Sequence, residues 1–212
     1  VYIKKGYMIP EAGRNAKGTN LVNIIQLDPG ERVSAMIRGS GFDPDKYLMM
    51  VTKRGTVKRI AQSALKNIRA SGIRALRLDE GDELISVRDT DGSRNILIAT
   101  QNGYAICFDE NDVRAMGREA TGVRGIRLRS GDYVVGAAIA DPGSDLLSIT
   151  ENGYGKRTAI TEYIRGTDGM PQKRGGMGLK NYNCTEKTGK VADIRIVSDQ
   201  DDILVISDDG TI

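Results

Sequence analysis

A hairpin pattern repeated along the chain is the strongest constraint on its fold. Each copy holds a short apolar run of β-forming residues, a polar turn that contains glycine, and a second run. The copies read YLMMVTKRGTVKRI, ILIATQNGYAICF, LLSITENGYGKRT and ILVISDDGTI, and their turn glycines are Gly55, Gly103, Gly153 and Gly210, which lie 48, 50 and 57 residues apart. Asn-Gly and Asp-Gly pairs supply the positive φ angles that tight hairpins require. The sequence therefore predicts four hairpins at a nearly regular period.

A second block is repeated between the hairpins. It reads GIRALRLDEGDELISV from Gly72 and GVRGIRLRSGDYVVGA from Gly122, with looser copies that begin at Gly18 and Gly178. Each copy predicts a strand, a glycine turn and another strand. Each period then holds about four strands and no convincing helix, which is typical of a propeller-like array of four-stranded blades. We expect an all-β single domain over residues 1–212, with repeat periods of approximately 1–56, 57–104, 105–154 and 155–212.

The two ends of the sequence fall at the same phase of the repeat. Val1 aligns with Val57, just past a hairpin glycine, and Ile212 aligns with the same position. We therefore expect the chain to be a piece of a longer array, with about four periods present.

Composition excludes several classes of function. The chain has no histidine, so Ser-His-Asp catalysis, Cys-His catalysis and histidine-ligated metal sites are excluded within it. Cys107 and Cys184 form no C-x-x-C pair, and we expect reduced thiols without a disulfide. No apolar run approaches the ~20 residues of a spanning helix, and the N-terminus lacks a signal-peptide pattern. We expect a cytoplasmic chain with no membrane partner, catalytic residue, metal site or bound cofactor of its own.

Basic residues recur at one phase of the repeat, although the formal net charge is only +3. Residues 66–77, 114–129 and 165–180 are basic, whereas residues 79–92 and the stretch after Asp199 are acidic. Equivalent positions of a radial array lie at equivalent radii, so these basic segments predict a positive stripe around the rim. A stripe of this kind suits a long polyanion such as duplex DNA. The alternative is that the charges only keep exposed loops soluble.

The candidate DNA-binding residues all belong to this basic phase or to its looser first copy. Basic loops poor in aromatic residues argue against a stacking platform for single strands, and no recognition helix is apparent. Contacts should therefore be mainly to the DNA backbone and weakly dependent on sequence. The candidates are Arg14, Lys17, Lys66, Arg69, Arg74, Arg77, Arg114, Arg118, Arg124, Arg127, Lys173, Arg174 and Lys180.

The stretch QKRGGMG combines a basic pair with glycines. Gly175 and Gly176 let a backbone approach closely, and Lys173 and Arg174 are suited to phosphate oxygens. A nucleotide-binding P-loop needs G-x-x-x-x-G-K-S/T between a strand and a helix, and this stretch has neither feature. We therefore expect a nucleic-acid phosphate here and not a nucleotide.

Four long stretches resemble one known family. IPEAGRNAKGTNLVNIIQLDPGERV, VTKRGTVKR, LDEGDELISV and DVRAMGREATGVRGIRL are similar to the C-terminal domain of the bacterial DNA gyrase A protein, and the resemblance covers essentially the whole chain. It implies a β-pinwheel, a six-bladed disc with strands exchanged between neighbouring blades. It also implies a basic rim that wraps DNA, so that the whole type IIA topoisomerase introduces negative supercoils.

The resemblance carries expectations about partners and cofactors. It implies three partners, which are duplex DNA, the gyrase A breakage-reunion domain and the gyrase B protein, in an enzyme of two A and two B chains. ATP and Mg²⁺ would be used elsewhere in that enzyme, within the bacterial cytoplasm and close to the nucleoid. None of the catalytic residues would lie in this chain.

The QKRGGMG stretch resembles the family's gyrase box, Gln-Arg-Arg-Gly-Gly-Lys/Arg-Gly, which is needed for wrapping. Met177 departs from the motif by replacing a basic residue. The family's principal box lies in the first blade, so the resemblance implies that this later copy is a degenerate blade loop. The matching residues, with Lys accepted for Arg, are Gln172, Lys173, Arg174, Gly175, Gly176 and Gly178.

Three other interpretations stay open. Within the same enzyme class, the chain could be the C-terminal domain of the topoisomerase IV A protein. A propeller could instead be a protein-interaction platform, although such platforms expose apolar patches where this chain repeats arginines. Finally, Asp201 and Asp202 form a carboxylate pair, for which a solvated acidic turn is a simpler explanation than metal chemistry.

Overall fold

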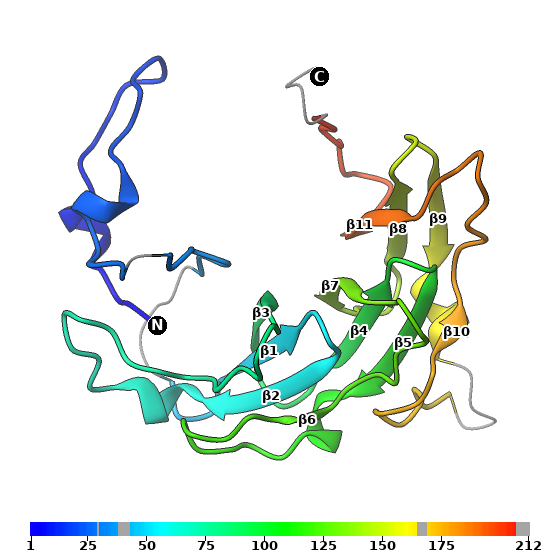
Figure 1. Cartoon of the computed structure of the whole chain (residues 1–212), viewed down its shortest axis with the longest axis horizontal. Helices are drawn as coiled ribbons and strands as arrows, with labels where there is room; N and C mark the ends of the chain where they lie inside the picture. The colour runs from blue at the N-terminus through cyan, green and yellow to red at the C-terminus, as the bar shows by residue number, and fades with distance from the viewer. Residues whose placement is uncertain (29, 38–42, 165–168, 207–212) are drawn as a thin grey trace.

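The computed structural model consists of antiparallel sheets arranged side by side along an arc (Figure 1). It describes residues 1–28, 30–37, 43–164 and 169–206. The first sheet contains β3 (Leu84–Thr90), β1 (Tyr47–Thr52), β2 (Thr56–Ala61) and β6 (Val123–Arg124), in that order. The second contains β7 (Val134–Ile139), β4 (Asn95–Thr100), β5 (Tyr104–Asp109) and β10 (Leu179–Lys180). The third contains β11 (Val191–Val197), β8 (Asp145–Thr150) and β9 (Gly155–Ala159).

The described residues form no α-helix, and the all-β prediction is confirmed. Short 3-10 helices occur at the ends of strands and in the N-terminal segment. These are η1 (Gly6–Met8), η2 (Leu21–Asn23), η3 (Gln62–Leu65), η4 (Glu110–Asp112) and η5 (Ile160–Tyr163).

Three of the four predicted hairpins are present, as β1–β2, β4–β5 and β8–β9. Gly55, Gly103 and Gly153 have φ angles of 81°, 79° and 79°, which is the left-handed conformation that glycine adopts without strain. The fourth prediction is not confirmed, because Ile203–Ile206 forms no strand. Its turn glycine, Gly210, lies outside the described residues.

The strands that follow the hairpins are exchanged between blades. β6 comes after β5 in the sequence but pairs with β2, and β10 comes after β9 but pairs with β5. β6 and β10 lie on the outer side of the arc, while β3, β7 and β11 lie on its inner side (Figure 1). This is the strand exchange that the family resemblance implies. Within the described residues, the outer edge of β9 has no partner strand.

The predicted strand-turn-strand blocks are confirmed only in part. The Gly122 copy forms β6 and β7, and the Gly178 copy forms β10 and β11. The Gly72 copy gives only β3, while the Gly18 copy gives η2 in place of two strands. A strand needs a neighbour to pair with, and in the described residues no strand lies beside residues 18–28.

Backbone contacts at Val1 confirm the alignment of the first repeat. The Val1 ammonium donates to the Ile73 carbonyl at 2.7 Å, and the Ile73 N–H donates to the Val1 carbonyl at 3.0 Å. Val57 and Val123 are partners at the same point of the next repeat. Val1 therefore lies where Val57 lies in its blade.

Two apolar clusters fill the spaces between successive sheets. The first contains Met49, Val57, Ile98, Phe108 and Val134. The second contains Leu97, Cys107, Leu146, Ile160 and Ile194. β4 contributes to both clusters because successive side chains of a strand face opposite ways. Each fully buried side chain contributes about 1.5–3 kcal/mol, so these clusters hold neighbouring blades together.

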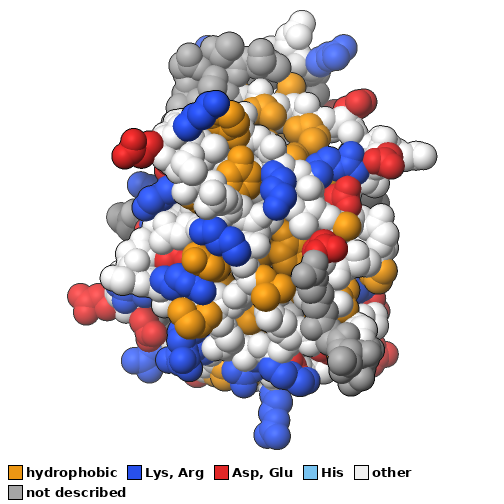
Figure 2. Space-filling model, turned by 90° about the vertical axis from the view of Figure 1, so that its right-hand side faces the viewer, with side chains coloured by type: hydrophobic (Ala, Val, Ile, Leu, Met, Phe, Trp, Pro, Cys, Tyr) orange, Lys and Arg blue, Asp and Glu red, His pale blue; other side chains and the backbone are white. Residues whose placement is uncertain are grey.

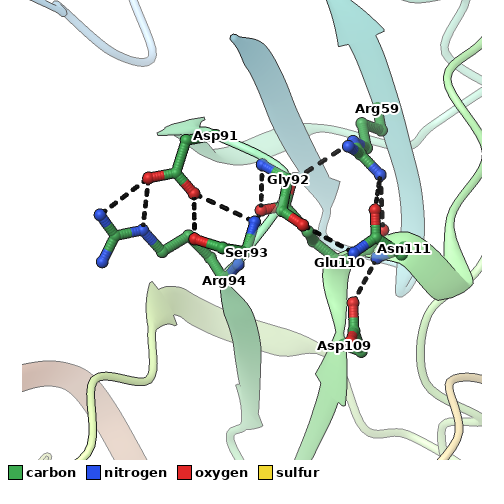
Figure 3. Close-up of polar contacts among 8 residues, drawn as sticks. All are labelled: Arg59, Asp91, Gly92, Ser93, Arg94, Asp109, Glu110 and Asn111. Atoms are coloured by element: carbon green, nitrogen blue, oxygen red, sulfur yellow. Dashed lines mark hydrogen bonds and ion pairs between the residues drawn. The ribbon is translucent and has the colours of Figure 1, made fainter. Parts of the chain in front are cut away.

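A buried ion pair, which we call the polar joint, also links the first two blades (Figure 3). Arg59 Nε of β2 lies 3.3 Å from Glu110 Oε2 of η4, and both side chains are buried. The other carboxylate oxygen accepts the N–H groups of Gly92 and Arg94 at 2.8 Å each. Arg59 also donates to Asn111 Oδ1 at 2.8 Å. Glu110 thus joins β2 to the turn that leads from the first blade to the second.

Candidate nucleic-acid interface

The exposure of the predicted DNA-binding residues fits a surface role. All of them are exposed except Arg174, which is half-buried. Among the described residues, the side chains of Arg74, Arg118 and Arg124 make no hydrogen bond or ion pair with the protein. Their charges are therefore available to a ligand. Arg165 and Asp168 of the third basic segment lie outside the described residues.

The exchanged strands bring basic residues to equivalent places in successive blades. Arg124 of β6 is opposite Thr56 of β2, and Lys180 of β10 is opposite Tyr104 of β5. Arg74 follows Ile73, the residue that pairs with Val1. The structure thus gives Arg124 and Lys180 the same position relative to the hairpin beside them, and Arg74 is the corresponding residue after the pair formed by Val1 and Ile73.

Figure 2 shows the side of the molecule that carries β9 and β10. Lys and Arg side chains extend from the top to the bottom of this face and are interleaved with hydrophobic side chains. Asp and Glu side chains lie mainly near its margins. The face is therefore positive along its length.

Arg129 shares the Tyr104 ring with Lys180 of β10 but is absent from the sequence-based candidates. Its guanidinium lies 3.3 Å from the centroid of the Tyr104 ring, and Lys180 Nζ lies 4.5 Å from the same centroid. Arg129 also donates to the Met177 carbonyl at 2.8 Å. Tyr104 is half-buried, and cation–π contacts contribute about 0.5–1 kcal/mol each at exposed sites and more where the cation is desolvated. The sequence signal was the tyrosine directly after the turn glycine, but its two cationic partners come from later segments of the chain.

Residues 172–178, which we call the box-like loop, dock on the preceding repeat. Arg174 Nε donates to the Asp112 carbonyl at 2.8 Å, and its Nη1 donates to the Arg124 carbonyl at 3.1 Å. Lys173 Nζ forms a 2.7 Å ion pair with Asp112 Oδ1, which raises the pKa of Lys173. Arg174 is thus held by protein carbonyls, and the contact of these two residues with phosphate stays a prediction.

The glycines of the box-like loop allow close contact with the protein itself. Gly175 has a φ of +83° and donates to the Gly125 carbonyl at 2.6 Å. Gly178 has a φ of +71°, and a Cβ there would lie 2.6 Å from the Ala105 carbonyl oxygen. The sequence predicted a close approach to phosphate, which stays a prediction, whereas the structure shows close approach to Gly125 and to Ala105 of β5. The Gln172 Oε1 atom is buried without a hydrogen-bond partner.

Three further features of the described residues bear on the chemistry of the chain. No cluster of three or more His, Cys, Asp or Glu residues within the described ranges could hold a metal ion. Cys107 and Cys184 are free, and burial raises the pKa of Cys107 to about 12. In the part of the chain that the structure describes, no helix is long and apolar enough to cross a membrane.

Comparisons with known proteins agree with the sequence resemblance. The family model described as DNA gyrase C-terminal domain, beta-propeller, matches residues 4–40, 46–91, 94–141, 144–170 and 171–198. The DNA gyrase A protein of Clostridium acetobutylicum is 53% identical over 210 residues, which cover 99% of this chain and 25% of that protein. The DNA gyrase A protein of Haloquadratum walsbyi is 40% identical over 218 residues, which cover 100% of this chain and 25% of that protein. The chain thus spans about a quarter of the length of these curated relatives.

Two solved structures share the fold. The C-terminal domain of DNA topoisomerase IV gives a TM-score of 0.77 at 27% identity and covers 86% of this chain and 55% of the other. The DNA gyrase A C-terminal domain gives a TM-score of 0.74 at 28% identity and covers 86% of this chain and 59% of the other. Since the family model matches most of the chain and the gyrase A sequences match its whole length, this chain belongs to the DNA gyrase C-terminal domain family.

Proposed function

We propose that this chain is a single DNA-wrapping domain over residues 1–212, which binds duplex DNA along the outer side of its arc. One observation carries the proposal. Arg124 and Lys180 occupy the same position beside successive hairpins, Arg74 follows the residue that pairs with Val1 one repeat earlier, and the two arginines have no protein partner among the described residues. Repetition of an exposed cation at one position of each repeat suits the repeating phosphates of a duplex.

The energetics favour many modest contacts over one strong site. Bending 20–30 base pairs around a small protein costs about 1–6 kcal/mol and up to about 10 kcal/mol for stiff sequences. Contacts to phosphate spread over several blades offset that cost without reading the base sequence. The other predicted DNA-binding residues would add further phosphate contacts along the outer side of the arc.

The function of the parent protein follows from the relatives' names and is part of the proposal. The wrap would present a DNA segment to the catalytic part of a gyrase, whose breakage-reunion domain and B protein would be the partners of this chain. ATP and Mg²⁺ would act there, and this chain would hold no cofactor. The cell compartment would be the cytoplasm, where the nucleoid lies.

A DNA titration at several salt concentrations tests the proposal. A duplex of mixed sequence should bind with an affinity that falls steeply between about 50 and 200 mM salt. The Arg74/Arg124/Lys180→Ala variant should lower the slope of log K against log salt by about 2.7, at about 0.9 per lost phosphate contact. Binding that is absent, or insensitive to salt, would falsify the wrapping function.

A matched variant controls for net charge. Lys46/Lys53/Arg195→Ala removes the same formal charge from positions beside carboxylates. Lys53 pairs with Glu83 at 3.4 Å and Arg195 with Asp193 at 2.8 Å, while Lys46 lines a cavity with Asp89 and Asp141. The control should keep most of the wild-type salt slope. An equal loss in both variants would show that only net charge matters.

The topoisomerase IV likeness defines the second candidate. The TM-score of 0.77 supports a wrapping domain of that enzyme, whereas 53% identity to a gyrase A protein favours gyrase. Supercoiling assays with the parent enzyme separate the two, since only gyrase would convert relaxed plasmid to negatively supercoiled plasmid.

A further inference from the structure

Lys58 of β2 is a lysine whose ammonium is buried inside the protein. The residue is 0% exposed, although lysine is almost never fully buried. Its Nζ donates to the carbonyl of Arg118 at 2.7 Å and to the carbonyl of Ala120 at 2.8 Å. Burial lowers the pKa of Lys58, and the charge of Glu119 partly offsets this. Lys58 cannot reach a ligand at the surface, so its role must come from the two backbone carbonyls that it binds.

The two carbonyls belong to residues 115–124, which we call the crossing segment. It runs from the second blade back to β2 and ends in β6. At its start, the Met116 N–H donates to the Arg59 carbonyl at 2.8 Å. At its end, Val123 pairs with Val57. Between these points, Lys58 supplies the side-chain bonds that tie the segment to β2.

The crossing segment carries two of the free cations. Arg118 provides one of the carbonyls that Lys58 binds, and Arg124 lies in β6, where the segment ends. Without the ammonium, the carbonyls of Arg118 and Ala120 would lose a charged donor. Hydrogen bonds to a charged group are stronger than those between neutral groups, so the segment would loosen between its two fixed ends.

We propose that Lys58 is a positioning residue for the DNA interface, holding the crossing segment so that Arg118 and Arg124 stand in register with the phosphate path. This inference rests on the proposed wrapping function. Lys58 acts through backbone carbonyls and touches no DNA itself. The Lys58 side chain is buried inside the blade, whereas Arg118 and Arg124, which it positions, are exposed.

A second lysine at the same place after its turn glycine makes a different contact, because it binds the residue that follows β10, a strand paired with β5. Lys156 follows its turn glycine by the same number of residues, and its Nζ donates to the Asn181 carbonyl at 2.8 Å. Lys156 is exposed and binds one carbonyl, whereas Lys58 is buried and binds two.

Hydrogen exchange and DNA bending together test the proposal on the full chain. Lys58→Met keeps an unbranched side chain only one atom shorter and removes its donors. Amides of residues 116–124 should exchange at least about 10-fold faster in this variant, while amides of β1 and β4 keep their protection. Energy transfer between the ends of a labelled duplex should report less bending. Lys46→Met is the matched control and should change neither measurement.

A double-mutant comparison separates positioning from general destabilisation. In an Arg118/Arg124→Ala background, Lys58→Met should reduce bending no further, because the side chains it positions are already gone. An equal reduction in both backgrounds, or unchanged exchange in residues 116–124, overturns the proposal. If Lys58→Met does not fold, Lys58→Gln, whose amide can still donate to one carbonyl, takes its place and should show intermediate values.

The two proposals fail in different ways. If the wild-type chain does not bend DNA, the wrapping function fails, and so does the assignment of Lys58 to a DNA interface. If the wild type bends DNA and Lys58→Met bends it equally well, only the role of Lys58 is wrong.

Discussion

Side chains of one chemical type have opposite roles in this protein. Lys58 and Arg59 are adjacent, buried and bonded to the protein, whereas Arg74 and Arg124 are exposed and free. Successive side chains of a strand face opposite ways, so Lys58 contacts the crossing segment and Arg59 contacts Glu110 in the polar joint. Counting basic residues in the sequence therefore overstates the charge available to DNA in β2.

The carboxylate of Asp91 accepts several hydrogen bonds within the turn between β3 and β4. Hydrogen bonds from Ser93 and the neighbouring Arg94 lower the pKa of its carboxyl to about 2. Because the pKa of Asp91 is lowered in the folded chain, its ionised carboxylate stabilises the turn fully at pH values above the usual aspartate pKa of about 3.9. This stabilisation is lost as the pH falls through about 2. A carboxyl-detected NMR titration should show a midpoint near 2, and Ser93→Ala should raise it. A midpoint at the ordinary aspartate value in the wild type would contradict the hydrogen-bonded turn.

At the scale of elements, the two blade joints use different chemistry at the same positions. Arg59 and Cys107 each follow their turn glycine by four residues, and Glu110 and Ile160 each follow theirs by seven. The first joint is therefore a buried ion pair, whereas the second is apolar, with Cys107 and Ile160 in one cluster. Buried ion pairs are often no more stabilising than an apolar pair of similar volume, but a half-removed pair is costly.

This contrast predicts a non-additive pair of substitutions. Glu110→Leu alone should destabilise the chain by about 3–5 kcal/mol, because the Arg59 charge stays buried without its partner. Arg59→Met combined with Glu110→Leu should recover part of this loss. Recovery stays incomplete because the Gly92 and Arg94 N–H groups lose their acceptor, at about 1 kcal/mol each. Urea unfolding measures both variants, and a double variant less stable than Glu110→Leu would refute the account.

The sequence predicted the hairpins well and the connections between them poorly. Asn-Gly and Lys-Arg-Gly turns identify β1–β2, β4–β5 and β8–β9 because turn chemistry is local. The exchange was visible only through family resemblance, since β6 and β10 are two residues long and their partners lie far back in the chain. For the same reason, spacing alone could not place Lys58 beneath Arg118 or Arg129 over Tyr104. The block from Gly72 predicted one strand before its glycine turn and one after it, but only the second, β3, is observed, beginning at Leu84.

At the scale of the whole molecule, the wrap should matter for supercoiling and not for strand passage itself. In the parent enzyme, the Arg74/Arg124/Lys180→Ala variant should lose most negative supercoiling, because the duplex is no longer bent around the arc. ATP-dependent relaxation should persist, since it would need only the catalytic part. Plasmid assays resolved on agarose gels measure both activities. Normal supercoiling by a variant that folds correctly would place the DNA on another face.

Strand exchange also has a consequence for how the protein is made. The outer edge of β2 gains its partner only when residues 123–124 have left the ribosome, a full repeat after the hairpin itself. Translation proceeds at about 5–20 residues per second, so the outer edge of each newly made blade stays unpaired for several seconds. Open edges invite pairing with other chains, so this interval is when newly made chains are most prone to aggregation. A pause in translation within one repeat would leave the preceding blade unfinished.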